Sequence, residues 1–252
     1  MDKRILQLDF SILLRSLADL LLPRVCAVCG RPLLACERHL CLECEAGLPF
    51  TRFESVRHNP MADKFNALVD APEYVRAFAL FYYQAGYQNI TQEVKYRRNF
   101  GIGRWFGRLL GEKMAPFVIL SVSEESSPSL TVVPVPLHWT RRWQRGYNQA
   151  EVIGRELASA IGAAFEPALL RRVRRTRTQT RLSATERAGN VSGAFKVSER
   201  AARRVLAPGL PEILLVDDVF TTGSTLAACY NALREAFGDS VRISVATLAY
   251  VE

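Results

Sequence analysis

The sequence lacks any run of about 20 apolar residues, the length that a membrane-spanning helix needs, and its stretch at residues 114–123 is about half that long. It also has no internal repeat and no low-complexity tract. Histidine is scarce, with 3 in 252 residues, and neither His58 nor His138 has a recognisable set of catalytic partners. These absences predict a soluble, cytoplasmic globular protein.

The first 22 residues are rich in leucine but do not form a continuous apolar segment. Asp9, Arg15 and Asp19 interrupt them, and no cleavage site of small residues follows. We therefore expect an amphipathic helix over residues 1–22 rather than a signal peptide.

Cysteine is almost absent outside one short segment. Cys229 stands apart, within an expected helix where a small buried side chain is the ordinary explanation. The other five cysteines crowd into residues 26–44, inside a segment, 23–50, that is too short and polar to fold around its own core. Such clustering indicates a metal site rather than a disulfide framework.

The spacing of these cysteines matches a structural zinc site. Two Cys-x-x-Cys pairs are separated by eleven residues, and four thiolates form a closed tetrahedral zinc site, with the predicted ligands Cys26, Cys29, Cys41 and Cys44. Gly30 permits the turn after the first pair. Cys36 and His39 are further ligand types, and either could replace one of the four. Reduced structural thiols or an iron–sulfur cluster are the alternatives.

The rest of the chain, residues 51–252, alternates between strand and helix patterns. We expect strands at 77–83, 131–135, 213–216 and 241–250, an extended segment at 194–197, and helices at 105–114, 148–161 and 224–237. This alternation predicts an α/β fold with a mostly parallel sheet covered by helices on both faces.

The most informative segment is residues 213–226, a buried strand that runs through two acids into a hydroxyl-rich turn and a helix. The helix N-terminus and Gly223 suit a phosphate group, and hydroxyl donors would come from Thr221, Thr222, Ser224 and Thr225. Asp217 and Asp218 follow the strand, where the hydroxyls of a ribose would lie and where we expect solvated carboxylates in the empty protein. The alternative is an ordinary capped turn.

Arginines supply further anion contacts. The chain carries 33 basic against 25 acidic residues, for a net charge of +8, which suits phosphorylated ligands or nucleic acid. The loop after residues 131–135 offers forked donors for pyrophosphate at Arg141, Arg142 and Arg145; a solvated loop is the alternative. Residues 171–187 hold seven arginines and a single acid, Glu186.

The string 213–226 resembles the phosphoribosyl pyrophosphate signature of type I phosphoribosyltransferases. From Cys26 onward, the chain also resembles the ComF family of competence-associated proteins. The residues that carry this resemblance are Val133-Pro134-Val135-Pro136-Leu137, the run Arg145 to Ala150, Gln179, Arg187, Asn190-Val191 and Ala194-Phe195. The resemblance implies a type I phosphoribosyltransferase fold, a hood over the acceptor within residues 51–130, and a link to DNA uptake or nucleotide metabolism.

The reaction implied is displacement at the anomeric carbon of phosphoribosyl pyrophosphate, bound with Mg²⁺, with no acceptor specified. Asp217, Asp218 and Arg177 are the predicted catalytic residues, and residues 171–187 correspond to the loop that closes over the reaction centre.

The alternative is a non-catalytic competence protein that retains this cleft and binds single-stranded DNA, in contact with the DNA-uptake machinery. Its predicted contacts are Arg171, Arg172, Arg174, Arg175 and Arg181. A second basic stretch, with Lys95, Arg97, Arg98, Arg104 and Arg108, lies among aromatic residues, a combination typical of single-strand binding. Lys95 and Arg97 could instead point into the substrate cleft.

Overall fold

The computed structural model describes residues 23–96, 99–119, 130–137, 143, 145–173, 193–206 and 211–252. The chain divides into two compact units, Met1–Leu48 and Pro49–Glu252. The expected helix at 1–22 lies outside the described residues. Within the described segments, none of the helices combines the length and apolarity that crossing a membrane requires.

A five-stranded sheet forms the centre of the larger unit. Its order is β1-β7-β6-β2-β3, and every neighbouring pair is parallel. The strands are β1 (Ala77–Tyr82), β2 (Leu130–Pro134), β3 (Ala164–Phe165), β6 (Glu212–Phe220) and β7 (Arg242–Tyr250). The middle strands are buried on both faces, as parallel sheets require. The predicted α/β class is confirmed.

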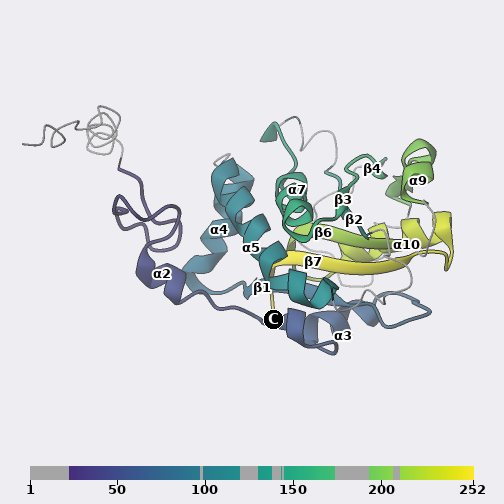
Figure 1. Cartoon of the computed structure of the whole chain (residues 1–252), viewed down its shortest axis with the longest axis horizontal. Coiled ribbons are helices and arrows are strands. Elements are labelled where there is room, and N and C mark those ends of the chain that lie inside the picture. Colours follow the sequence, from purple (N-terminus) through teal and green to yellow (C-terminus); the bar gives the residue numbers. More distant parts are fainter. Residues whose placement is uncertain are drawn as a thin grey trace, which may run out of the picture. The chain divides into compact units, whose positions relative to one another are not determined.

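Helices cover both faces of the sheet because the crossovers run in opposite directions. From β2 the chain passes through α7 (Gln149–Ile161) to the outer strand β3, whereas from β6 it passes through α10 (Ser224–Phe237) to β7. Right-handed crossovers of opposite direction place their helices on opposite faces. The long α5 (Phe100–Ile119) packs on α7 (Figure 1). On the other face, α3 (Pro60–Asn66) packs against α10 through Phe65, whose ring centre lies 5.8 Å from that of Tyr230.

Smaller elements complete the unit. They include a two-stranded antiparallel ribbon of β4 (Leu170–Arg172) and β5 (Phe195–Val197), the helices α4 (Gln88–Tyr96) and α9 (Glu199–Val205), and the short turns η1 (Phe53–Ser55) and η2 (Ala85–Tyr87). The expected helix 224–237 has these bounds in the structure. The expected strand at 213–216 is wrong in length, because β6 continues to Phe220.

Glycines allow α5 and α7 to pack closely. A Cβ atom on Gly107 would lie 2.5 Å from the carbonyl oxygen of Ile153, and one on Gly111 would lie 2.6 Å from the Cβ of Ala160. Any larger residue at these two positions would therefore push the helices apart. The close packing places α7 firmly over β2 and β6, beside the candidate site.

Candidate functional site

The candidate site lies at the carboxyl edge of the sheet, where β2 and β6 are neighbours. At this boundary the chain from β2 goes to one side of the sheet and the chain from β6 goes to the other. Crevices outside the carboxyl ends of strands at such a reversal are the usual ligand sites of open α/β sheets. The loops after β2 and β6 both reach this edge, and these are the loops in which the sequence analysis placed anion contacts.

The two acids of the motif lie inside β6 rather than after it. Asp217 pairs with Thr247 of β7, and pairing continues to Phe220. Asp218 is only 8% exposed and Asp217 is half-buried. The expectation of solvated carboxylates is therefore wrong, because the strand carries both acids into the protein.

Asp218 has a charged partner from a distant part of the chain. The Nζ atom of Lys95, near the end of α4, lies 2.9 Å from Oδ2 of Asp218. Burial lowers the pKa of Lys95, but the charge of Asp218 and the hydrogen bond to it outweigh burial, so the net shift is upward. The interpretation of Lys95 as a cleft residue is thereby favoured over a solvent-facing nucleic-acid contact. Arg97 lies outside the described residues.

The electrostatic environment of Asp217 differs from that of Asp218. Burial and the neighbouring charge of Asp218 raise its pKa to about 7, against the opposing effects of the Asp218 amide, Lys95 and Arg172. The amide N–H of Asp218 donates to Oδ1 of Asp217 over 2.9 Å. Asp217 also raises the pKa of the buried Cys229 thiol, where burial is the larger cause. Side chains alternate along a strand, so the two acids face opposite sides of β6.

The turn from Thr221 to Thr225 presents a helix N-terminus. Gly223 is the N-cap of α10 with φ of 72°, and no side chain caps the helix there. Thr221 and Thr222 are exposed, and the hydroxyls of Thr222 and Ser224 are 3.0 Å apart. Amide N–H groups at an uncapped helix start, with hydroxyls beside them, form a suitable environment for a phosphate.

Gly223 has a packing role that sequence reasoning missed. A Cβ atom there would lie 2.6 Å from Cζ of Phe220 and 2.8 Å from Cδ1 of Leu68. A side chain at this position therefore collides with the core beneath the turn, so a Gly223 variant tests folding as much as phosphate binding.

The predicted arginines are only partly within the described residues. The guanidinium of Arg145 lies 5.2 Å from the ring centre of Tyr96, which follows Lys95 in α4. Arg171 and Arg172 belong to β4 and, with Pro136 and Leu137 after β2, line a cavity of about 460 Å³. Outside the described residues lie Arg141, Arg142, Arg174, Arg175, Arg177 and Arg181.

The four predicted zinc ligands come together in the smaller unit. The Sγ atoms of Cys26, Cys29, Cys41 and Cys44 all lie within 4.8 Å of one another, and those of Cys29 and Cys41 are 3.8 Å apart. A tetrahedron with Zn–S bonds of about 2.3 Å has sulfur–sulfur edges of about 3.8 Å. The donor set therefore fits a structural zinc ion. Among the described residues, this cluster consists of the four predicted cysteines, and Cys36 and His39 are not part of it.

The fold of the knuckles explains this geometry. The amide of Gly30, at φ of 73°, donates to the carbonyl of Cys26 over 2.9 Å and closes the first turn. The second pair flanks the start of α2 (Leu42–Ala46). Arg31 donates to Sγ of Cys41 over 3.2 Å and pairs with Glu43 at 2.8 Å, and this contact lowers the pKa of Cys41 to about 6. A thiol with a lowered pKa is more readily a thiolate, the form that binds metals.

The chain is similar in sequence to proteins named for competence and for DNA utilization. No family model matches the chain. It is 31% identical over 182 residues to competence protein F of Haemophilus influenzae, covering 71% of this chain and 75% of the relative. It is 29% identical over 221 residues to the DNA utilization proteins YhgH of Salmonella typhimurium and of Escherichia coli K12, covering 87% of this chain and 88% of each relative.

The parallel sheet and the four-cysteine cluster define an α/β protein with a small N-terminal module whose donor set fits a structural zinc ion. Within that class the similarity extends over most of the chain. The chain belongs to the ComF family of competence proteins.

Proposed function

We propose that the protein binds phosphoribosyl pyrophosphate at the carboxyl edge of its sheet and acts in the uptake or use of DNA. The observation that best supports this ligand is the turn Thr221–Thr225. It forms a helix N-terminus without a side-chain cap and follows β6, the strand that holds the two acids. The relatives named for competence and for DNA utilization support the biological setting.

Each part of the ligand has a matching group. The 5-phosphate would accept hydrogen bonds from the amides and hydroxyls of Thr221, Thr222, Gly223, Ser224 and Thr225. The ribose hydroxyls would donate to whichever of Asp217 and Asp218 faces the ligand, because the two acids lie on opposite sides of β6. The pyrophosphate would lie toward the loop after β2, whose sequence carries Arg141, Arg142 and Arg145, and toward the cavity lined by Arg171 and Arg172.

Mg²⁺ would enter as part of the ligand complex. It prefers oxygen donors and keeps several waters, and it would neutralise charge on the pyrophosphate. Asp218 is already paired with Lys95, and the pKa of Asp217 is raised to about 7. Neither acid is therefore set up as a dedicated anionic ligand, which fits an outer-shell role.

The reaction we propose is pentosyl transfer. An acceptor's electron pair forms the new bond to the anomeric carbon, and the bond from that carbon to pyrophosphate breaks, with pyrophosphate keeping the electron pair. The protein's residues would orient the sugar and stabilise the charge on the leaving group, with Arg177 as the predicted cation of the closing loop.

The experiment compares Mg²⁺–phosphoribosyl pyrophosphate binding by calorimetry in wild type and in the double variant Thr222→Val, Ser224→Ala. Loss of hydrogen bonds to a charged group should weaken binding at least about tenfold. Ser159→Ala, at an exposed serine on α7, is the matched control and should bind normally. Unchanged affinity in the double variant removes the turn from the proposal. Pyrophosphate release with candidate acceptors then tests turnover.

A second candidate function is single-stranded DNA binding. Tyr96 is 65% exposed and Trp143 is 86% exposed, and Arg145 stacks on Tyr96. Exposed aromatics next to guanidinium groups are typical base-stacking surfaces.

The test of this candidate is charge reversal at Arg174 and Arg175, with binding measured at two salt concentrations. Binding should weaken and its salt dependence should fall. Arg200→Glu, at an exposed arginine on α9, is the control. DNA binding that is unchanged by reversal at Arg174 and Arg175 would exclude these two arginines as DNA contacts.

A further inference from the structure

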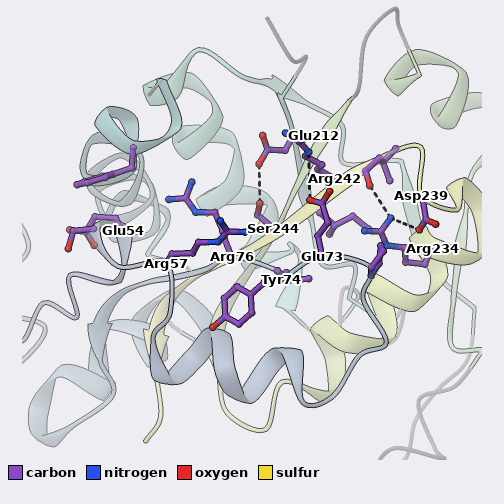
Figure 2. Close-up of a pocket in the computed structure, with 16 residues that line it drawn as sticks. Glu54, Arg57, Glu73, Tyr74, Arg76, Glu212, Arg234, Asp239, Arg242 and Ser244 are labelled. Atoms are coloured by element: carbon purple, nitrogen blue, oxygen red, sulfur yellow. Dashed lines mark hydrogen bonds and ion pairs between the residues drawn. The ribbon is translucent and has the colours of Figure 1, made fainter. Parts of the chain in front are cut away.

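A second cavity opens at the opposite, amino edge of the sheet. It has a volume of about 600 Å³, and Arg76, Glu212 and Arg242, which precede or begin β1, β6 and β7, line it (Figure 2). The strand β6 has nine residues, so it separates this cavity from the Thr221–Thr225 turn by roughly 25 Å. The two sites are therefore distinct.

Most charged groups around this cavity already have partners. Arg234 lies 3.5 Å from Asp239 and also donates to Tyr230 and to two backbone carbonyls. Ser244 donates to Glu212 over 3.1 Å, and the long contact of 3.9 Å between Arg242 and Glu73 joins two exposed side chains (Figure 2). Two other guanidinium groups that line the cavity take part in none of these contacts.

Arg57 and Arg76 are the two remaining cations. Among the described residues, no carboxylate lies within 4.0 Å of either one. Arg76 is half-buried, with its guanidinium 5.1 Å from the ring centre of Phe78. Stacking on a ring occupies the face of a guanidinium and leaves its in-plane N–H donors for an acceptor.

The electrostatics at Arg76 favour an added anion. Burial lowers the pKa of Arg76, Glu212 opposes this effect, and the nearby charge of Arg57 lowers the pKa further. An oxyanion between Arg57 and Arg76 would relieve that like-charge repulsion and accept hydrogen bonds from both forks.

The rest of the lining indicates the kind of molecule that carries the oxyanion. Phe117, Val75 and Ile243 supply apolar surface beside the arginines. The volume lies within the range of small-molecule sites, which combine apolar walls with a few placed polar groups. We propose that this cavity is a binding site for a small organic oxyanion, a phosphate ester or carboxylate on a partly apolar body, held by Arg76 and Arg57.

The experiment uses phenyl phosphate and benzoate as probes of the full-length protein, with binding followed by calorimetry and ligand-observed NMR. We expect at least one probe to bind, and Arg76→Met to weaken that binding at least about tenfold, since each fork donates charge-assisted hydrogen bonds. Arg155→Met is the matched control, because Arg155 also stacks on a phenylalanine ring, 4.7 Å from the centre of Phe165. It should bind like wild type.

The outcomes separate this site from the carboxyl edge. Phenyl phosphate could also occupy the Thr221–Thr225 turn, so the double variant Thr222→Val, Ser224→Ala is titrated in parallel and should retain the site that Arg76→Met removes. Probe affinity that is equal in wild type and Arg76→Met overturns the proposal, as does the lack of any binding up to a probe concentration of roughly 10 mM. Neither result bears on phosphoribosyl pyrophosphate binding.

Discussion

Lys95 and Asp218 form an ion pair of 2.9 Å although 123 positions separate them in the sequence. The side chain of Asp218 is only 11% exposed, and that of Lys95 is 25% exposed. The pair joins α4, which follows β1, to β6, which lies two strands away from β1 in the sheet. A ligand that binds there would meet these two charges together.

Replacing Lys95 with Met should destabilise the protein by about 1–3 kcal/mol, because it leaves a buried carboxylate without its counter-charge, moderated by partial solvent access. Urea unfolding at neutral pH measures the change. Arg108→Met is the matched control, since it breaks an ion pair of 3.1 Å to Glu156 whose arginine is 61% exposed, and it should cost less than about 0.5 kcal/mol. Equal losses in the two variants would contradict a special role for the Lys95 pair.

Asp217 should make the protein less stable as pH rises, whereas a carboxyl group whose pKa falls on folding makes a protein more stable as pH rises. Its pKa rises from 3.8 to about 7 on folding, so the folded state binds the proton more tightly. The contribution of Asp217 is most favourable below pH 4 and is lost as pH rises through about 7. Relative to wild type, Asp217→Asn should therefore gain stability between pH 4 and 7, by a few kcal/mol at most, with a constant difference above.

Urea unfolding of both proteins across that pH range provides the measurement. The difference between the two curves isolates Asp217 from other titrating groups. A flat difference between pH 4 and 7 would mean that Asp217 ionises normally in the folded protein.

The strands and helices around the candidate site follow patterns that a sequence displays directly. The apolar run before Asp217 predicts a buried strand, and Gly223 followed by Ser224 predicts the start of α10. The cysteine spacing likewise predicts the four ligands, because tetrahedral coordination restricts where thiols can lie.

What the sequence could not predict depends on contacts between distant segments. The helix α4 has only nine residues, most of them polar, so the sequence did not predict it, nor the pairing of Lys95 with Asp218. The depth of both acids depends on how far β6 pairs with β7, which the local sequence does not encode. The close approach of Gly223 to Leu68 is a tertiary contact of the same kind.

Gly107→Ala should destabilise the protein by about 1–3 kcal/mol even though alanine favours a helix by about 1 kcal/mol. The new Cβ would lie 2.5 Å from the carbonyl oxygen of Ile153, a backbone atom that cannot move aside without shifting α7. Gly101→Ala, at an exposed position of the same helix, is the control and should be neutral or slightly stabilising. Thermal unfolding of both variants checks this, and a stabilised Gly107→Ala protein would show that the helices do not pack this closely.

The cysteine cluster should bind one zinc ion per chain, because its four sulfur atoms form a closed tetrahedral donor set and its segment has little core of its own. Elemental analysis of freshly reduced protein measures the stoichiometry. Cys44→Ser should lower zinc content strongly, whereas Cys36→Ser, at an exposed cysteine outside the cluster, should retain it.

Removing the metal should also unfold the cysteine segment, because the free energy of zinc binding contributes directly to the stability of such a module. A chelator should therefore make residues 23–48 sensitive to limited proteolysis, and added zinc should restore protection. Iron in place of zinc, or equal protection with and without the chelator, would rule out a structural zinc site. Because the larger unit has its own buried core around β6 and β7, its unfolding transition should change little in the same experiment.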